Sequence, residues 1–302
     1  MKQLQKFMNV CIIMTASSMM LAGCGDSATP TSSATPASTT SGDTSTAAAT
    51  GEVNADVQKI IDRGVLKVGV KNAVIGFGYQ DPLTNEYSGM EIDIAKKIAD
   101  KLGVDVEFTT VTAATRTELL DSGDIDCVLA TFTITDERKE SWDFSTPYYT
   151  DHVTVLVNDA SGIKSIGDLK DKKVGVSSGS TSAKSLVEEM LAKNVFTSEA
   201  FSVDTFDPAT WTDSVSFQQY DDYPSISVAL GAGEIDAFCV DKSILAVYKT
   251  EGRSYIDDEF APQEYGVATK KGSGFSKYVD DVVNELLNDG TIDKLIADNN
   301  LN

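Results

Sequence analysis

The sequence is poor in the side chains that build metal sites. Its 302 residues include one histidine, His152, and four cysteines, and no two cysteines stand in a Cys-x-x-Cys pair. Zinc and most other transition-metal sites need clustered cysteine or histidine ligands, so a metal site is not expected. We expect no cofactor either.

Basic residues are also scarce. Lysine and arginine number 25 against 46 aspartates and glutamates, which gives a formal net charge of −21 at pH 7. Binding to nucleic acid by counterion release requires a basic face, so nucleic acid is not an expected partner. Net charge bears on solubility and association rather than on one buried pocket, so it does not by itself predict a cationic ligand.

An apolar stretch lies at the N-terminus, where Lys2 and Lys6 precede a run from Phe7 to Leu21. The run is short for a membrane span, which needs about 20 apolar residues. It ends in Leu21-Ala22-Gly23-Cys24, which resembles the lipobox of bacterial lipoproteins. The resemblance implies a signal peptide over residues 1–23, lipidation of Cys24, and a protein anchored at the extracytoplasmic face of the cell membrane. An ordinary secretory signal is the alternative.

Residues 24–55 are rich in serine, threonine, alanine and proline and offer little to bury. Such a composition predicts a disordered, extended tether. About 250 residues remain from Asp56 onward, enough for two lobes of ordinary domain size.

The folded part shows alternating strands and helices. Buried runs at 65–70, 104–111 and 125–130 alternate with helical patterns at 91–102 and 117–122, which end at Gly103 and Gly123. This alternation predicts parallel strands joined by crossover helices, and hence an α/β fold. The rhythm continues with a strand at 173–177 and helices at 183–192 and 223–230.

Two short stretches resemble each other. Gly123-Asp124-Ile125-Asp126 precedes a buried run that ends at Thr131, and Gly233-Glu234-Ile235-Asp236 precedes one that ends at Asp241. Coincidence between two common turns is the alternative. We favour two similar lobes, because ligands bind outside the carboxyl ends of strands in such sheets and both runs end in polar residues.

The stretch from residue 131 to 149, TFTITDERKESWDFSTPYY, combines small hydroxyls with one arginine. Thr131 and Thr133 stand close before Arg138. A guanidinium with nearby hydroxyl and amide donors suits a carboxylate, because its planar fork matches two oxygens. The alternative is a surface ion pair between Arg138 and one of Asp136, Glu137 or Glu140.

This stretch resembles the signature of the bacterial family 3 extracellular solute-binding proteins: a hydroxyl-x-hydroxyl strand end, then Thr-x-x-Arg, then Asp-Phe-Ser-x-Pro-Tyr. The resemblance implies a monomeric amino-acid receptor, not an enzyme, that serves an ABC transporter permease. It also implies a two-lobed periplasmic-binding-protein-like fold (type II), with a two-strand hinge and a ligand cleft between the lobes. Lobe 1 would comprise residues 56–149 and 266–302, and lobe 2 residues 150–265.

The resemblance implies roles for several residues. Arg138 takes the α-carboxylate of the ligand with Thr133, helped from the other lobe by Ser180 and Thr181 in a turn that opens a helix. Asp241 accepts the α-ammonium with Thr131 beside it. A helix N-cap is the alternative role for Asp241, and Phe132 either lines the pocket or belongs to the core.

In the aspartate/glutamate-binding branch of this family, an arginine 22 residues before Arg138 reaches the distal carboxylate, and Arg116 stands there. With Lys71 and Tyr223 it would supply two cations and a phenol, which predicts aspartate or glutamate as the ligand. Glutamine or another polar amino acid is the alternative. Arg116 could instead pair with Asp121 or Glu118, and Lys71 could be a solvated strand end.

Some features do not follow the family pattern. Gly76-Phe77-Gly78-Tyr79 stands where many members have Pro-Phe, so no ligand-stacking aromatic is assigned, and the segment 195–219 is longer than usual. Enzymatic activity on the same fold is a less favoured alternative, because Glu91 and Asp93 are interpreted as acids that interact with a helix dipole. A sensor domain is another. Cys127 and Cys239 are expected in different lobes, which argues against a disulfide.

Overall fold

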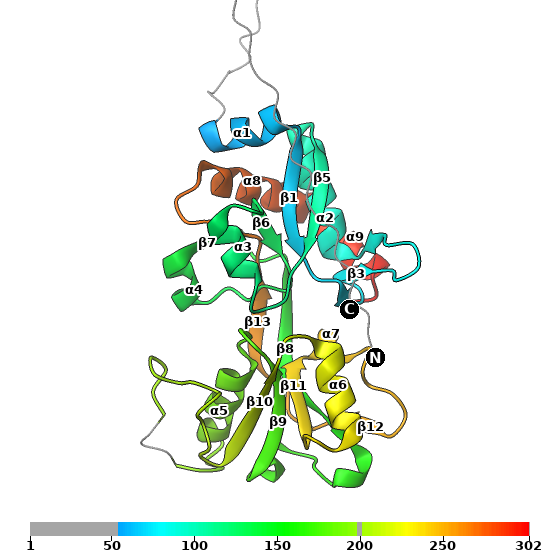
Figure 1. The fold of residues 1–302 in the computed structure, drawn as a ribbon, viewed down its shortest axis with the longest axis vertical. Helices are drawn as coiled ribbons and strands as arrows, with labels where there is room; N and C mark the ends of the chain where they lie inside the picture. The colour runs from blue at the N-terminus through cyan, green and yellow to red at the C-terminus, as the bar shows by residue number, and fades with distance from the viewer. Residues whose placement is uncertain (1–53, 198–200, 302) are drawn as a thin grey trace, which may run out of the picture. The chain divides into compact units, whose positions relative to one another are not determined.

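Two mixed β-sheets organise the part of the chain that the computed structural model describes, residues 54–197 and 201–301 (Figure 1). The predicted signal peptide, Cys24 and nearly all of the tether lie outside the described residues. The first sheet has the order β5-β1-β6-β14-β7, and the second the order β10-β9-β11-β8-β12, with β13 paired to β8. These sheets confirm the expected α/β class. We call the first sheet with its helices lobe 1 and the second sheet with its helices lobe 2.

In lobe 1, β1 lies between β5 and β6 and is parallel to both, while β14 is antiparallel to β6 and to β7. The strands are β1 (Val65–Val70), β5 (Asp105–Thr110), β6 (Cys127–Leu129), β7 (Trp142–Phe144) and β14 (Ala268–Lys270). A small sheet joins β2 (Ala73–Val74), β3 (Gly78–Gln80) and β4 (Tyr87–Ser88). The helices are α1 (Ala55–Arg63), α2 (Met90–Leu102), α3 (Arg116–Ser122), α4 (Asp136–Ser141), α8 (Gly274–Asn288) and α9 (Thr291–Asp298).

In lobe 2, β9 lies between β10 and β11 and is parallel to both, and β8 is antiparallel to β11. The strands are β8 (Tyr149–Asn158), β9 (Lys172–Ser177), β10 (Val215–Tyr220), β11 (Ala237–Asp241), β12 (Arg253–Tyr255) and β13 (Phe260–Tyr265). The helices are α5 (Ser182–Ala192), α6 (Tyr223–Ala232), α7 (Lys242–Leu245) and the 3-10 turns η1 (Asp159–Ser161) and η2 (Ile166–Leu169). No helix among the residues placed here is long and apolar enough to cross a membrane.

The repeated sequence unit has the same geometry in both lobes. A carboxylate oxygen of Asp126 accepts a hydrogen bond from the backbone N–H of Lys67 at 2.8 Å, and Asp236 does the same with Lys173 at 2.8 Å. Each aspartate thus links the strand it precedes to the neighbouring parallel strand. Two glycines also correspond: a Cβ on Gly69 would lie 2.6 Å from Ile125, and one on Gly175 would lie 2.4 Å from Ile235. The two stretches are therefore equivalent in structure.

Strands β8 and β13 run side by side between the two sheets (Figure 1). They pair antiparallel from Tyr149 opposite Tyr265 to Val153 opposite Phe260, with an irregularity at Ala261, whose φ is +45°. Phe77 packs edge-on against Tyr149 and Tyr265, with ring centroids 5.1 and 5.7 Å apart. The chain connects the lobes through this strand pair.

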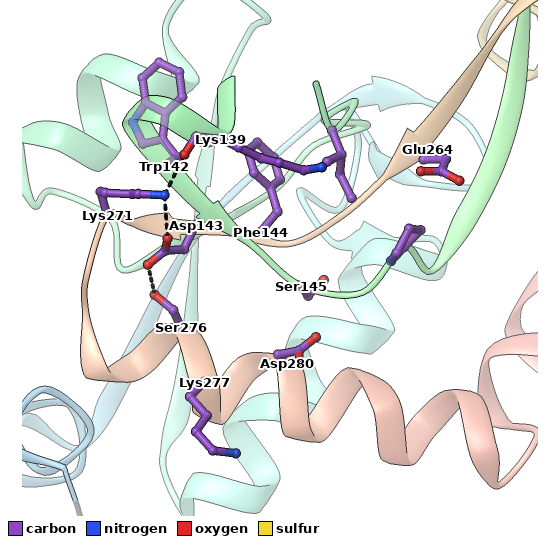
Figure 2. Close-up of a pocket in the computed structure, with 12 residues that line it drawn as sticks. Lys139, Trp142, Asp143, Phe144, Ser145, Glu264, Lys271, Ser276, Lys277 and Asp280 are labelled. Atoms are coloured by element: carbon purple, nitrogen blue, oxygen red, sulfur yellow. Dashed lines mark hydrogen bonds and ion pairs between the residues drawn. The ribbon is translucent and has the colours of Figure 1, made fainter. Parts of the chain in front are cut away.

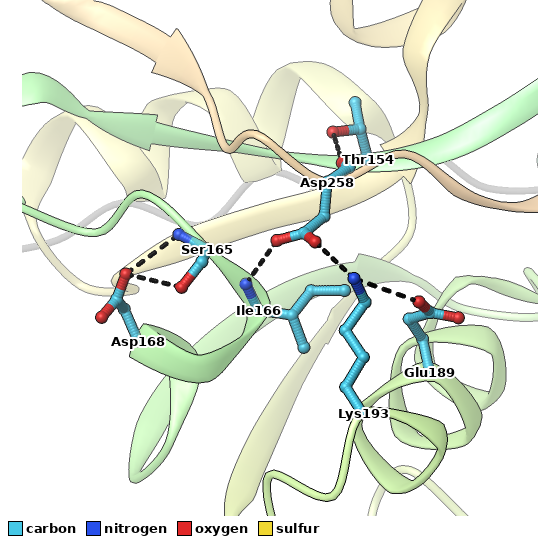
Figure 3. Close-up of polar contacts among 7 residues, drawn as sticks. All are labelled: Thr154, Ser165, Ile166, Asp168, Glu189, Lys193 and Asp258. Atoms are coloured by element: carbon cyan, nitrogen blue, oxygen red, sulfur yellow. Dashed lines mark hydrogen bonds and ion pairs between the residues drawn. The ribbon is translucent and has the colours of Figure 1, made fainter.

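One carboxylate ties together several parts of lobe 2 (Figure 3). Asp258 accepts a hydrogen bond from the N–H of Ile166 at 2.8 Å and pairs with the ammonium of Lys193 at 2.7 Å. Its own carbonyl accepts from Thr154 in β8 at 2.8 Å. A capping box between Ser165 and Asp168 fixes the start of η2 beside it. The turn, the end of α5 and the sheet are thereby held in one arrangement.

The long segment 195–219 packs through aromatic side chains. Trp211 lies 5.5–6.2 Å from three phenylalanine rings, measured between ring centroids. These rings belong to Phe196, Phe201 and Phe206, and they pack against the hydrophobic core of lobe 2. The described part of segment 195–219 is thus an extension of that core.

Each lobe contains one buried free cysteine. Cys127 lies in β6 of lobe 1 and Cys239 in β11 of lobe 2, and both are fully buried. Burial raises the pKa of both thiols well above the ordinary value, because the thiolate would lose its hydration. The two residues occupy different sheets, as the resemblance implies.

Candidate functional site: a cleft between the lobes

Arg138 joins the two lobes. Thr135 caps the N-terminus of α4 by accepting the N–H of Arg138 at 3.1 Å, which fixes the start of the arginine side chain. The guanidinium donates through Nη1 to the carbonyl of Thr133 at 2.8 Å and through Nη2 to the carbonyl of Gly179 in lobe 2 at 3.2 Å. No acidic side chain in the described ranges forms an ion pair with Arg138, so the surface ion-pair alternative is wrong.

Two guanidinium groups lie against the ring of Phe132. The carbon Cζ of Arg116 is 3.8 Å from the ring centroid, and that of Arg138 is 4.7 Å from it. The same ring packs against Trp142 and Phe144 and is almost fully buried. It is therefore both a core residue and a cation–π platform that holds the two arginines in place.

Arg116 begins α3 and is 3 % exposed. Its Nη1 donates to the carbonyls of Ala130 at 2.9 Å and Thr131 at 3.2 Å, while its buried Nε has no partner within the described structure. The proposed ion pair with Asp121 or Glu118 does not form, because the guanidinium points inward; Asp121 accepts from the indole of Trp142 instead. The edge of the guanidinium formed by Nε and Nη2 is the one that can bind a carboxylate through two parallel hydrogen bonds.

Lys71 follows β1 and is 5 % exposed, so the solvated alternative is wrong. Its ammonium lies 5.4 Å from the centroid of the Tyr223 ring, and Tyr223 is itself buried. Burial, followed by the charge of Arg116, lowers the pKa of Lys71 well below its ordinary value. The structure thus brings together Lys71, Arg116 and Tyr223, the three residues predicted to choose the ligand.

Two predicted carboxylate-binding hydroxyls meet at one residue of the hinge. Thr133 of lobe 1 and Thr181 of lobe 2 each donate to the side-chain oxygen of Gln263 at 2.8 Å. Ser180 lies beside Thr181, and its buried hydroxyl has no partner among the described residues. Gln263 was not predicted as a site residue, although its position in β13 brings it between the lobes.

Asp241 ends β11 and is buried. It stands at the N-cap position of α7 but makes no side-chain cap hydrogen bond, so the capping alternative is wrong. Its carboxylate accepts from the hydroxyl of Tyr265 in β13 instead. Burial, followed by the charge of Asp151, raises the pKa of Asp241 to about 7.

Glu91 was interpreted as a partner of a helix dipole, and it does lie in the first turn of α2, where the structure gives it further partners. Its side chain is fully buried, and Oε1 accepts from the backbone N–H of Thr131 at 2.6 Å and from the hydroxyl of Tyr148. Thr131 has a φ of +45°, a strained value for a β-branched residue. Glu91 accepts from the N–H of Thr131 and Arg116 donates to its carbonyl, so the two side chains hold the backbone of Thr131 in this conformation. The missed signal is that Glu91 shares the apolar helix face of Ile94, Ala95 and Ile98.

A cavity of about 680 Å³ opens onto this cleft. Its walls include Arg116, Phe132, Arg138 and Thr181, and segment 195–219 contributes residues such as Phe206. Its size lies within the range of small-molecule sites.

A second hollow lies in lobe 1 beside β7 and α8 (Figure 2). Two of its charged side chains pair with each other: Asp143 contacts Lys271 at 3.1 Å, and Asp143 also contacts Ser276 at 3.1 Å. No group of three potential metal ligands occurs in the described ranges.

The family profile of the bacterial extracellular solute-binding proteins, family 3, matches residues 66–299. The chain belongs to this family. The match includes most of both lobes and every residue assigned to the cleft, from Lys71 to Gln263. The two-lobed type II fold expected from the signature stretch is thereby confirmed.

Three relatives show the range of this similarity. The ABC transporter glutamine-binding protein GlnH from Bacillus subtilis (strain 168) is 33% identical over 243 residues, 78% of this chain and 81% of its own. The L-cystine-binding protein TcyJ from Escherichia coli (strain K12) is 34% identical over 245 residues, which are 79% of this chain and 84% of its own. The glutamate-binding protein GluB from Corynebacterium glutamicum is 30% identical over 260 residues, 79% of each chain.

The similarity extends to solved structures. An ancestral arginine-binding protein bound to arginine superposes with a TM-score of 0.65 at 33% identity, covering 78% of this chain and 98% of that one. By their names, these relatives are binding proteins rather than enzymes, which supports the expectation that the family member described here is not an enzyme. Because their named ligands differ, the similarity does not by itself establish the aspartate/glutamate branch.

Proposed function

We propose that this protein is the amino-acid receptor of an ABC importer and that its ligand is aspartate or glutamate. Receptors for glutamine, cystine and glutamate are among its relatives, so a free amino acid is the class of ligand that the similarity supports. An α-carboxylate and an α-ammonium are common to all of these ligands. Burying either charge without a partner costs several kcal/mol, so the cleft must provide a partner for each.

The α-carboxylate is assigned to Arg138 and the hydroxyls of Thr133 and Thr181. The guanidinium and the two hydroxyls come from both lobes, and the contact of Arg138 with Gly179 shows how closely they approach. The side-chain oxygen of Gln263 now accepts the hydrogen bonds of both hydroxyls, and a ligand carboxylate would replace it as the acceptor. Binding therefore favours the closed arrangement of the lobes.

The α-ammonium is assigned to Asp241. This carboxylate is buried and has no cationic partner within ion-pair distance among the described side chains. A ligand ammonium would supply that partner.

The unpartnered Nε of Arg116 is the observation that carries the acidic-ligand assignment. Its guanidinium is fixed by two backbone carbonyls and by the ring of Phe132, so the Nε–Nη2 edge is preorganised to bind a second carboxylate. Lys71 adds a second buried basic group nearby; burial and the charge of Arg116 lower its pKa, and the carboxylates of Glu91 and Asp241 act in the opposite direction. A second carboxylate on the ligand would favour the charged form of Lys71, and the neutral amide of glutamine would not.

Calorimetric titration of the full chain with the twenty amino acids tests this assignment. We expect stoichiometric binding of L-aspartate or L-glutamate, with weaker binding of L-glutamine. Arg138→Ala should weaken every ligand by about 2 kcal/mol or more, because the shared carboxylate loses its partner. Arg116→Gln should weaken the acidic ligands selectively. A wild-type preference for glutamine over glutamate would contradict the second carboxylate site and leave the receptor function intact.

The location of the receptor is also part of the proposal. The lipobox-like sequence ending at Cys24 favours a lipid anchor, and residues 24–55 would then tether the folded part at the extracytoplasmic face of the membrane, as a monomer beside its permease. Metabolic labelling with a radioactive fatty acid, compared between wild type and Cys24→Ser, tests the anchor. Equal labelling of both would contradict it.

A further inference from the structure

The ammonium end of the cleft contains a second carboxylate. Asp151 lies in hinge strand β8, 6 % exposed, and its oxygen Oδ2 is 3.4 Å from the hydroxyl of Tyr265. The same hydroxyl forms a close hydrogen bond with Asp241. One phenol from hinge strand β13 therefore stands between two buried carboxylates.

Asp151 is supplied with donors of its own. Its Oδ1 accepts from the N–H of His152 at 2.8 Å, and Oδ2 accepts from the N–H of Ser243 at 3.2 Å and from the Ser243 hydroxyl. These donors suit an ionised carboxylate. Asp241, in contrast, has only the Tyr265 hydroxyl as a hydrogen-bond donor among the described groups.

A count of protons distinguishes the two acids. The Tyr265 hydroxyl has one proton and can donate to one carboxylate at a time. When Asp241 holds a proton, it can donate to the phenol oxygen while the phenol donates to Asp151, so each oxygen contact has its own hydrogen. When Asp241 is ionised, the phenol donates to Asp241 and the two negative charges face each other across it.

Charged and titratable groups surround Asp241 on every element packed against it. They are Lys71 after β1, Arg116 in α3, Arg138 in α4, Tyr223 in α6, Cys239 in β11, and the Asp151 of β8 and Tyr265 of β13 already described. The charges of Arg116 and Arg138 favour the ionised form of Asp241. Burial and Asp151 outweigh them, and the resulting pKa of about 7 makes the proton exchangeable near neutral pH.

We propose that Asp151, Tyr265 and Asp241 form a proton-exchanging unit of the ligand site, in which the incoming α-ammonium displaces a proton from Asp241 and the Tyr265 hydroxyl turns from Asp151 to Asp241. The O–H bond of the Asp241 carboxyl breaks, its proton passes to solvent, and the ammonium takes its place as the positive partner. Asp151 is a positioning residue in this unit. The inference rests on amino-acid binding through Asp241 and is independent of the ligand's side chain.

The test measures proton release and affinity across pH. Titration of the full chain with L-glutamate at pH 6.5, in phosphate and in imidazole buffer, should give different apparent enthalpies that correspond to release of a fraction of one proton. The dissociation constant should rise by about tenfold per pH unit below pH 7 and level off above it. An affinity constant between pH 5.5 and 8, with no proton release, would overturn the proposal.

Two variants separate this mechanism from a structural role. Asp151→Asn removes the neighbouring charge and should shift the midpoint of the pH profile to lower pH. Tyr265→Phe removes the donor to ionised Asp241 and should shift it to higher pH. Equal weakening at every pH, or shifts in the same direction, would show that both residues only support the fold. If L-glutamate does not bind, L-glutamine replaces it as the probe, because the ammonium is common to both.

Discussion

The Nη2 group of Arg138 in lobe 1 donates a hydrogen bond to the carbonyl of Gly179 in lobe 2 at 3.2 Å. Gly179 has a φ of +73°, and a Cβ there would lie 2.8 Å from the carbonyl oxygen of Ala113 in lobe 1. The two lobes therefore approach at backbone level where the ligand carboxylate is expected. A glycine is required there for two reasons, its φ and the space available.

Gly179→Ala should weaken ligand binding at least tenfold, because the methyl group would hold the lobes apart. It should also lower the free energy of unfolding by about 1 kcal/mol through its φ. Gly162→Ala is the matched control, since Gly162 has a φ of +74° but open space around its Cβ. The control should lose similar stability and keep its affinity. Calorimetry and urea unfolding of both variants measure these effects, and equal affinities would contradict the close-approach argument.

Glu91→Ala should lower the free energy of unfolding by about 3 kcal/mol, because it leaves the Thr131 N–H and the Tyr148 hydroxyl buried without an acceptor. Glu91→Gln retains an acceptor oxygen and should lose less. Asp93→Asn is the control in the same helical turn: its side chain is 41% exposed and pairs with Lys96 at 3.3 Å. Its change should stay within about 0.5 kcal/mol. Similar losses in urea unfolding for Glu91→Ala and Asp93→Asn would contradict the stabilising role assigned to the two hydrogen bonds of Glu91.

Asp241→Asn should stabilise the ligand-free protein at pH 8. The pKa of Asp241 is raised from 3.8 to about 7, chiefly by burial, so the stability of its protonated form is fully present below pH 4 and lost as the pH rises through 7. Asparagine does not ionise and avoids this loss. Thermal unfolding at pH 4 and pH 8 should show a melting-temperature gain at pH 8 that is smaller at pH 4. A pH-independent difference would contradict the buried-charge explanation.

The order of strands and helices could be predicted from the sequence to a large extent, because its signals are local. Gly64, Gly103 and Gly123 end helices with a left-handed φ, as glycines after an apolar helical pattern are expected to. The repeated Gly-acid-Ile-Asp unit has the same role in each lobe, since its last aspartate binds a backbone N–H of the neighbouring parallel strand.

The site was predictable only in part, because the partners of its polar groups lie far away in the sequence. Asp241 was weighed as a cap for the helix that follows it, but its partner is Tyr265, 24 residues on. Gln263 is 130 residues from Thr133 and 82 from Thr181, and no local pattern connects them. Such pairs form when the hinge strands bring the lobes together, and nothing in the spacing of a single sequence reports that approach.

The two buried cysteines give the protein one natural chemical reporter in each lobe. Thiol reagents cannot reach Cys127 or Cys239 in the folded state, since both are fully buried, so each becomes reactive only when its own sheet opens. The rate at which each is modified, followed by mass spectrometry of the corresponding peptides, would then measure the opening of lobe 1 and of lobe 2 separately. A ligand that binds across the cleft should slow both rates together, and a change confined to one lobe should slow or hasten one alone.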